Sequence, residues 1–247
     1  MNAMSPALEK PTDGVHSETT RVRRAACPEL SIDEIEFHLF RPRSSRHPLL
    51  RAAYELWRNE WLATLGELDG ITRLHSDEFG RLDEIGVLSI GQRCISIIGL
   101  RWFDLSLPMA REDSYFQHWP EEVINRVAHG IVATTSNVCV HSDWRRAIID
   151  PSAERAGAPA SLTLTTVALG FRRCMESPAE HVIAVTRNDR SMNRVAAAAG
   201  AMTIGQIQLH GIDSDLILLT RENAKTRGPV FDVLWSRRCQ EQISLSP

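Results

Sequence analysis

Short apolar runs separated by turn residues predict the strands of this chain. The segment IEFHLF at 35–40 alternates apolar and polar positions, as a strand does when only one of its faces is fully buried. EIGVLSI at 84–90 and CISIIGLRWF at 94–103 are separated by a short connection that contains glycine, which predicts a hairpin. Further strands are expected at 131–140, at 181–187, and on both sides of a turn at 211–213.

Apolar residues that recur at spacings of three and four predict the helices. The longest such pattern lies between Pro48 and Leu65 and contains Leu50, Tyr54, Trp57, Trp61 and Leu65. A second helix is expected over 161–177, with Ser161 as its N-cap. Shorter helices are expected from 120 to about 129 and over 188–200, where Gly200 ends the pattern.

The order of these elements predicts the organisation of the chain. Strands alternate with helices and hairpins, which predicts an α/β (α+β) fold with a mixed central sheet and helices on both faces. Residues 1–30 are polar with scattered prolines and are expected to form a flexible, disordered tail. We expect one domain over 31–223, followed by a polar C-terminal extension over 224–247.

Composition and charge narrow the function classes. The net charge of -3 argues against general nucleic-acid binding. The five cysteines are widely spaced without a C-x-x-C pair, which indicates reduced thiols in a cytoplasmic protein. Because no apolar run reaches about 18 residues, no membrane span is expected. The histidines show no spacing typical of metal ligands, so no metal site is expected.

Several common catalytic motifs are missing from the sequence. It contains no G-x-S-x-G, H-E-x-x-H, G-x-x-x-x-G-K-[ST] or G-x-G-x-x-G. Hydrolase, zinc-protease, P-loop and dinucleotide-binding functions therefore have no support from local motifs.

The stretch from Asn137 to Leu162 offers more positive evidence. An apolar strand ends in HSDWRR, and a loop rich in proline, glycine and alanine then leads into a helix. The N-terminus of a helix favours an anion because its first N–H groups are unpaired. Arg145 and Arg146 are candidates to bind an anion such as a phosphate. The alternative is that both arginines belong to an exposed loop.

The stretch RNDRSMNRVAAAAGA at 187–201 resembles the N-x-x-A…G-F segment of GNAT acyltransferases. Asn193 takes the asparagine place, Ala196 takes the small-residue place, and the order of elements from Pro48 onward also resembles that fold. The resemblance implies that two parallel strands splay apart and bind the pantetheine arm of an acyl thioester. The implied donor-binding residues are Val138, Cys139, Val140, Arg145, Arg146 and Asn193.

Three N-terminal segments resemble N-acyl amino acid synthases and, more distantly, acyl-homoserine-lactone synthases. They are LRAAYELWRNEW at 50–61, HSDEFGRLDE at 75–84 and IIGLRWFD at 97–104. Asp77 matches the first acidic residue of a D-x-[FY]-D loop, although Gly80 replaces the second. The resemblance implies that acyl chain and acceptor are bound by Trp57, Trp61, Arg101 and Phe103. Ordinary core packing is the alternative for the aromatic residues.

These resemblances together imply an N-acyltransferase that moves an acyl group, expected to be long, from a thioester to an amine such as an amino acid. No tightly bound cofactor is expected; acyl carrier protein or coenzyme A would deliver the donor. The loop over 141–160 and its Pro159 depart from the compact Q/R-x-x-G-x-G/A turn, which favours carrier protein. The base for the amine would be His141 or Asp77, with Asp143 as a further relay. The alternatives are an acetyl-CoA-dependent N-acetyltransferase and an inactive GNAT-like binding module.

Overall fold

The computed structural model describes residues 28–74, 78–127, 130–151 and 157–240. Its main sheet has eight strands in the order β11-β2-β3-β4-β5-β8-β10-β9, and a small sheet has the order β1-β6-β7. The strands are β1 (Glu29–Ser31), β2 (Ile35–Phe40), β3 (Glu84–Ile90), β4 (Arg93–Asp104), β5 (Ile131–Val140), β6 (Ile148–Asp150), β7 (Ala160–Ser161), β8 (His181–Arg187), β9 (Met202–Leu209), β10 (Ile212–Thr220) and β11 (Cys239–Gln240). The predicted mixed sheet is confirmed, with β5 and β8 parallel and its other long pairs antiparallel.

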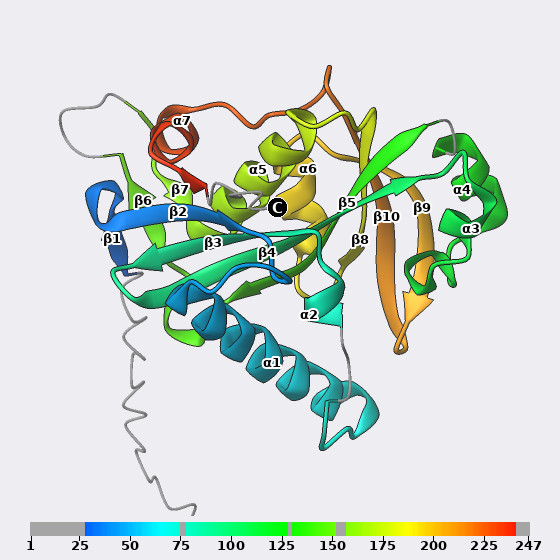
Figure 1. Ribbon diagram of the computed structural model, residues 1–247, viewed down its shortest axis with the longest axis horizontal. Coiled ribbons are helices and arrows are strands. Elements are labelled where there is room, and N and C mark those ends of the chain that lie inside the picture. The colour runs from blue at the N-terminus through cyan, green and yellow to red at the C-terminus, as the bar shows by residue number, and fades with distance from the viewer. Residues whose placement is uncertain (1–27, 75–77, 128–129, 152–156, 241–247) are drawn as a thin grey trace, which may run out of the picture.

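Helices cover both faces of this sheet, as predicted. Figure 1 shows α1 on one side and α5, α6 and α7 on the other. The helices are α1 (Pro48–Asp69), α2 (Glu78–Arg81), α3 (Pro108–Arg111), α4 (Glu121–Val127), α5 (Leu162–Met175), α6 (Met192–Ala198) and α7 (Pro229–Ser236), with 3-10 turns η1 (Ile32–Glu34), η2 (Ser114–Phe116) and η3 (Ser142–Trp144). Among the described residues, no helix has the length and apolar character needed to cross a membrane.

The alternation of side chains along the central strands separates the two faces. On β4, Ile97 packs into the cluster beneath α1, whereas Ile98 and Leu100 pack beneath α5 and α6. On β5, Val132 joins the cluster of α3 and α4, and its neighbour Ala133 joins the α5 cluster. Because strand side chains alternate with a period of two, α1, α3 and α4 share one face of the sheet, called here the α1 face.

The apolar face of α1 differs from the prediction. The buried residues are Leu49, Ala53, Leu56 and Trp57. Tyr54 is 42% exposed and packs at the rim of the cluster, where its ring contacts those of Trp57 and Phe79. The buried face of α1 therefore contains Ala53 and Leu56 rather than Tyr54, and the small side chain of Ala53 allows the helix to approach the sheet closely. The helix ends at Gly70, whose φ of 67° is typical of a C-terminal glycine.

The prediction of a disordered tail over residues 1–30 is wrong for residues 29 and 30. Glu29–Ser31 forms β1, which pairs with β6, and Leu30 is buried in a core cluster. The other residues of the predicted tail, 1–27, lie outside the described residues, and Pro28 already accepts a hydrogen bond from Ile148. A single apolar residue in a polar segment gives little sequence signal, so this pairing was missed.

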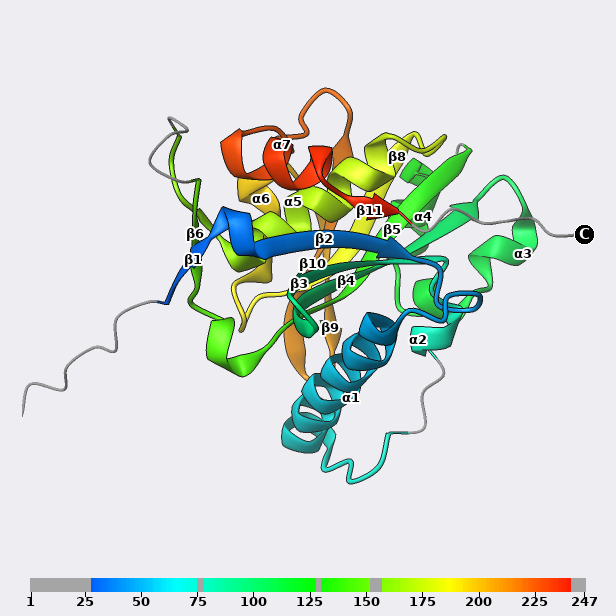
Figure 2. The same cartoon turned by 60° about the vertical axis from the view of Figure 1, so that its left-hand side comes forward.

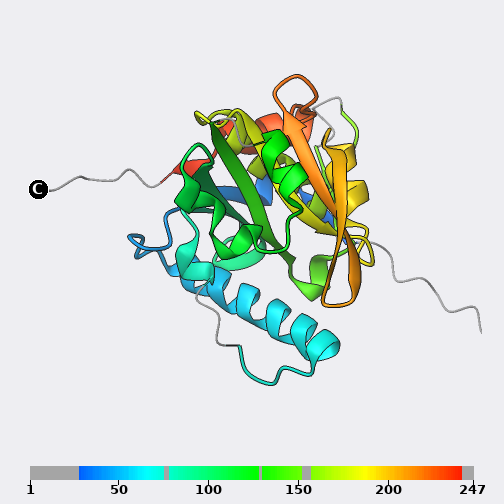
Figure 3. The same ribbon diagram turned by 90° about the vertical axis from the view of Figure 1, so that its right-hand side faces the viewer.

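The prediction of a polar segment after the last long strand is wrong over 229–236. These residues form α7, which buries Val230, Leu234 and Trp235. The Trp235 ring lies 5.9 Å from the ring of Phe37 on β2. Figure 2 shows β11, which follows α7, beside β2 at the edge of the sheet. The other edge is β9, which with β10 is coloured orange in Figure 3.

Candidate active site

The central feature of the site is an opening between β5 and β8. The two parallel strands pair only at Val132–His181, Ala133–Val182 and Thr134–Ile183. Beyond these pairs β5 continues to Val140 along β4, and β8 continues to Arg187 along β10. We call residues 131–134 the closed end of β5 and residues 135–140 its open end. Among the described residues, the facing edges of the open end therefore have no strand partner, although the Tyr115 side chain reaches the backbone of Val185 on β8.

A β-bulge lies within the open end. Gly99 on β4 pairs with Ser136, but Ile97 pairs with Cys139, so β5 carries one extra residue there. Asn137 takes up the irregularity with a φ of 55°, in the left-handed region that asparagine tolerates better than most residues. A bulge bends its strand and redirects its N–H groups. It thereby contributes to the departure of β5 from β8.

The three predicted donor-binding residues of β5 point in different directions. Val138 is partly buried against the α5 and α6 cluster, and Val140 packs with α5 and α7. Cys139 faces the α1 cluster, where burial raises the pKa of its thiol. A neutral, buried thiol is a poor nucleophile, so Cys139 offers no route to a covalent acyl-enzyme. Of the three, Val138 and Val140 are the residues whose backbone can face the opening, because Cys139 pairs with Ile97 and its carbonyl accepts from Ser96 on β4.

The candidate bases lie in or beside the turn after β5, except for Asp77, which lies outside the described residues. His141 caps η3, and its Nδ1 accepts from the Asp143 N–H at 3.4 Å. The same Nδ1 lies 3.6 Å from the Asp143 carboxylate, so the ring is directed into the turn. The Asp143 carboxylate binds Arg93 at 2.6 Å, and this hydrogen bond from Arg93 holds its pKa below the usual value. Neither group is poised as a base in this conformation.

The two arginines of the turn have different surroundings. Arg145 binds Glu60 on α1 with an Nη2–Oε2 distance of 2.5 Å. Arg146 is exposed and has no side-chain partner among the described residues. Arg145 therefore ties the turn to α1, while Arg146 is the arginine that remains open to a donor.

Asn193 lies at the start of α6 and is held by a buried carboxylate. Its Nδ2 donates to Asp215 at 3.2 Å, and its Oδ1 accepts from the Arg194 N–H. Asp215 also accepts side-chain hydrogen bonds from Asn188, Thr203 and Gln206. Burial raises the pKa of Asp215, but these four donors outweigh it and hold the pKa below the ordinary value. In this arrangement Asn193 helps to fix the β8 side of the opening.

Sequence reasoning missed this Asp215 network. Asp215 follows Asp213 and Ser214 and stands directly before the apolar run Leu216–Leu219 of β10, so the sequence gives it little distinct signal. Its partners come from the segment after β8, from α6 and from β9. A buried acidic residue among apolar neighbours generally needs donors, but the sequence does not show which residues supply them.

The predicted substrate-binding residues fall into two groups. Trp57 and Trp61 pack in the α1 cluster together with Cys139, so they lie beside the open end of β5. Arg101 and Phe103 lie farther along β4, where Arg101 pairs with Thr134 at the closed end. Arg101 binds Asp113 through two hydrogen bonds of 3.1 and 2.7 Å, and its guanidinium lies 4.4 Å from the centre of the Phe103 ring. All four residues therefore lie on the α1 face, but their side chains are already packed or paired.

The N-terminus of α5 meets the open end from the other face. Ser161 caps the helix as predicted, accepting from the Leu164 N–H at 3.2 Å. The Leu162 N–H donates to the Ala147 carbonyl at 3.0 Å, and β7 pairs with β6 in the small sheet. Two of the N–H groups that a helix N-terminus offers to an anion are thus used within the protein.

Comparisons with known proteins identify the fold. No family model matches the sequence, and no curated protein matches it either. Among solved structures, the CoA-dependent acyl-homoserine lactone synthase BjaI, determined with SAM and isopentyl-CoA, aligns over 85% of this chain and 95% of its own, with 14% identity and a TM-score of 0.52. FeeM, an N-acyl amino acid synthase from uncultured soil microbes, aligns over 77% of this chain and 95% of its own, with 10% identity and a TM-score of 0.50.

The similarity extends over most of the chain, although the sequences have diverged widely. The predicted resemblance to this group of proteins is confirmed at the level of the fold. The chain therefore has the fold of GNAT-like acyltransferases.

Proposed function

We propose that this chain is an N-acyltransferase that moves an acyl group from a pantetheine thioester to an amine. The observation that carries the proposal is the loss of pairing between β5 and β8 after Thr134–Ile183, next to the bulge at Asn137. An extended pantetheine arm contains amide groups, which can pair with the free backbone edge as a further strand would. The thioester carbonyl then lies near the N–H groups of Val138 to Val140.

The reaction follows from this placement. The amine nitrogen attacks the thioester carbon, forming the C–N bond and a tetrahedral oxyanion. Backbone N–H groups near Val138 stabilise that oxyanion, because they are fixed before the charge develops. The C–S bond then breaks, and the thiolate takes up the proton that the amine nitrogen loses. Asp77 and His141 remain our candidates for moving that proton, with His141 needing to turn its ring away from Asp143.

The donor that we favour is an acylated carrier protein. Coenzyme A carries a pyrophosphate, which needs several free N–H groups at the turn before α5. In this chain the turn leads through β6 and β7, and Leu162 and Leu164 already use their N–H groups. The single phosphodiester of a carrier protein needs fewer free N–H groups, and the exposed Arg146 can bind it. Because BjaI is described as CoA-dependent, acyl-CoA remains a necessary arm of the test.

The acceptor that we favour is an amino acid, as in the name of FeeM. It would reach the thioester from the α1 face, where Arg101 lies next to the paired closed end of β5. Arg101 is only partly exposed and is bound to Asp113, so it would shape the acceptor site together with that carboxylate. A long acyl chain would lie along the apolar side chains beside Trp61. Each buried CH₂ group contributes about 0.8 kcal/mol to its binding.

Thiol release from purified protein tests the proposal directly. The donors are a long-chain acyl-carrier protein, the matching acyl-CoA and acetyl-CoA, each with pooled amino acids. We expect thiol release to depend on the amino acids and to be fastest with the acyl-carrier protein. Mass spectrometry of lipid extracts from an overexpressing bacterium identifies chain length and acceptor together.

The outcomes separate the alternatives. Turnover with acetyl-CoA alone would replace the long-chain proposal with an N-acetyltransferase. Equal turnover with acyl-CoA and acyl-carrier protein would remove the preference for the carrier. If none of the three donors were turned over and no new lipid appeared, the proposed acyltransferase activity would be contradicted and an inactive binding module favoured.

A further inference from the structure

Three buried polar groups on the α1 face have no hydrogen-bond partner within the part of the chain that the structure describes. They are the hydroxyls of Thr134 and Tyr115 and the indole N–H of Trp119. Thr134 is wholly buried and forms the last pair between β5 and β8, with Ile183. Because leaving a buried polar group unpaired destabilises a fold, such groups call for a functional explanation.

Contacts among their neighbours bring these three groups together. Thr134 pairs with Arg101 on β4, and Arg101 binds the Asp113 carboxylate through two hydrogen bonds. The same carboxylate accepts from the Tyr115 N–H at 2.9 Å. The Tyr115 ring lies 6.0 Å from the Trp119 ring. We call Thr134, Tyr115 and Trp119, which surround the Arg101–Asp113 pair, the hydroxyl cluster.

The hydroxyl cluster borders the opening between β5 and β8. The Tyr115 side chain reaches the backbone of Val185, which lies two residues past the Thr134–Ile183 pair on β8. Ile183 and Val185 pack with Tyr115 among the residues of α3 and α4, so all three side chains lie on the α1 face. The cluster is therefore at the inner limit of the opening, on the face from which the proposed acceptor would approach.

The hydroxyl cluster is electrically neutral. Arg101 and Asp113 bind each other, and Arg81, which also acts on Asp113, is exposed to solvent. Burial raises the pKa of Tyr115, so its hydroxyl keeps its proton. A charged substrate group would be buried here without a counter-charge, and an apolar group would leave the hydroxyls unpaired. An uncharged group that forms hydrogen bonds fits best.

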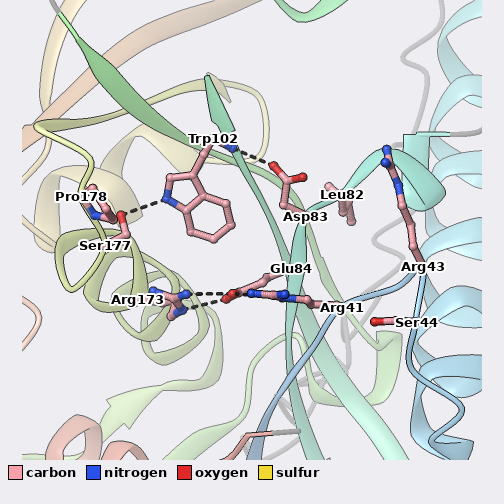
Figure 4. A pocket seen from close by; sticks show the side chains of 10 residues that line it. All are labelled: Arg41, Arg43, Ser44, Leu82, Asp83, Glu84, Trp102, Arg173, Ser177 and Pro178. Carbon is pink, nitrogen blue, oxygen red and sulfur yellow. Dashed lines mark hydrogen bonds and ion pairs between the residues drawn. The ribbon is translucent and has the colours of Figure 1, made fainter. Parts of the chain in front are cut away.

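A cavity of about 410 Å³ at the end of α5 shows the opposite arrangement (Figure 4). There the indole N–H of Trp102 donates to Ser177 at 2.9 Å. The Glu84 carboxylate accepts two hydrogen bonds of 2.7 Å from Arg173. These polar groups satisfy one another inside the protein, so the hydroxyl cluster is the stronger candidate for binding a ligand.

We propose that the hydroxyl cluster selects an amine acceptor whose side chain carries an uncharged hydroxyl or carboxamide group. Such a group forms hydrogen bonds with the hydroxyls of Tyr115 and Thr134 and brings no charge into the site. A site built in this way rejects an analogue that lacks the group, because its own buried hydroxyls are then left unpaired. The inference rests on the proposed acceptor site and names the class of amino acid that it takes.

Calorimetric titration of the full chain with matched amino acids tests this selection without requiring turnover. Threonine and valine have nearly the same shape and differ by a hydroxyl, whereas asparagine and aspartate differ by a charge. Each is titrated with and without a non-reactive amide analogue of S-acylpantetheine. We expect threonine to bind at least about tenfold more tightly than valine, and asparagine at least about tenfold more tightly than aspartate.

The outcomes separate this inference from the proposed function. Equal affinities within either pair, or no saturable binding of threonine and asparagine, would overturn the selection. Selective binding without thiol release from any donor would support the site and contradict acyl transfer. Thiol release that does not distinguish threonine from valine would support acyl transfer and contradict the selection.

Variants locate the selection. Tyr115→Phe and Thr134→Val should each reduce the threonine-to-valine affinity ratio at least about threefold, without lowering the melting temperature, because neither hydroxyl has a partner in the described chain. The matched controls are Tyr54→Phe, at the exposed rim of α1, and Thr165→Val, which removes an unpaired buried hydroxyl on α5. An unchanged ratio in both variants, or an equal fall in the controls, would contradict the assignment. A lower melting temperature in both variants would also contradict it, because the fold itself would then use these hydroxyls.

Discussion

The two ends of β5 satisfy their polar groups in opposite ways. At the closed end, β5 is paired on both sides, and the nearby charges of Glu84 and Arg173 are buried against each other. At the open end, one edge of β5 lacks a strand partner, and the charged side chains of Arg93, Asp143 and Arg145 form pairs at the surface. The closed end depends on internal pairing for stability, whereas the open end has the unpaired strand edge on which our proposed function rests.

The largest effect is expected from breaking the buried pair near the closed end. Glu84→Gln leaves Arg173 largely buried without its counter-charge, which should lower the free energy of unfolding by about 3 kcal/mol. Urea denaturation measures this change in the free energy of unfolding. Glu55→Gln removes the exposed pair with Arg51 on α1 and should change stability by less than about 0.5 kcal/mol. Equal effects of the two substitutions would show that burial does not distinguish these pairs.

The second-largest effect on stability is expected at Asp215 on β10, whose hydrogen bonds hold the β8 side of the opening. Asp215→Asn should lower stability by about 2 kcal/mol at pH 7, because four donors lose their charged acceptor. The folded pKa of Asp215 lies below its unfolded value, so the carboxylate stabilises the fold above about pH 4. This contribution is lost as the pH falls through the folded pKa. The stability gap between the two proteins should therefore close at acidic pH, and a gap that stays constant would contradict this role.

A smaller effect on stability is expected at the bulge. Asn137→Ile places a β-branched residue at a φ of 55°, which should cost about 1 kcal/mol. Because the bulge positions the N–H groups of the opening, acyl transfer should fall by more than the stability change explains. Asn137→Gly keeps the conformation and should retain most of the transfer rate. If both substitutions reduced the rate equally, the side chain of Asn137 rather than the backbone would be responsible.

The smallest effect on stability is expected at the surface of the open end. Arg146→Ala should leave urea denaturation unchanged, since this side chain has no partner among the described residues. It should raise the KM for an acylated carrier protein about threefold to tenfold, an effect that added salt reduces. Arg126→Ala on α4 removes an exposed arginine elsewhere and serves as control. The same KM in Arg146→Ala and the control would remove Arg146 from the donor site.

The local sequence pattern was sufficient to predict most of the strands and helices around the two ends of β5. The strands at 35–40, 84–90, 131–140 and 181–187 coincide with β2, β3, β5 and β8, because alternation and apolar runs report burial directly. Ser161 was correctly predicted to cap α5, since its bond to Leu164 spans three residues. The burial of Leu30 and of α7 was missed, because their packing partners lie far away in the chain.

The sequence by itself therefore determined most of the long strands and helices and their order, and its resemblance to GNAT acyltransferases implied the arrangement of the sheet. The tertiary structure alone decided which groups stay free. Arg145 is paired with Glu60 across 85 positions, and Glu84 with Arg173 across 89. Such pairs depend on how whole elements approach one another, and neighbouring residues carry no record of that. The resemblance implied that two parallel strands splay apart, but the bulge at Asn137 and the point at which β5 leaves β8 are visible only in the tertiary structure.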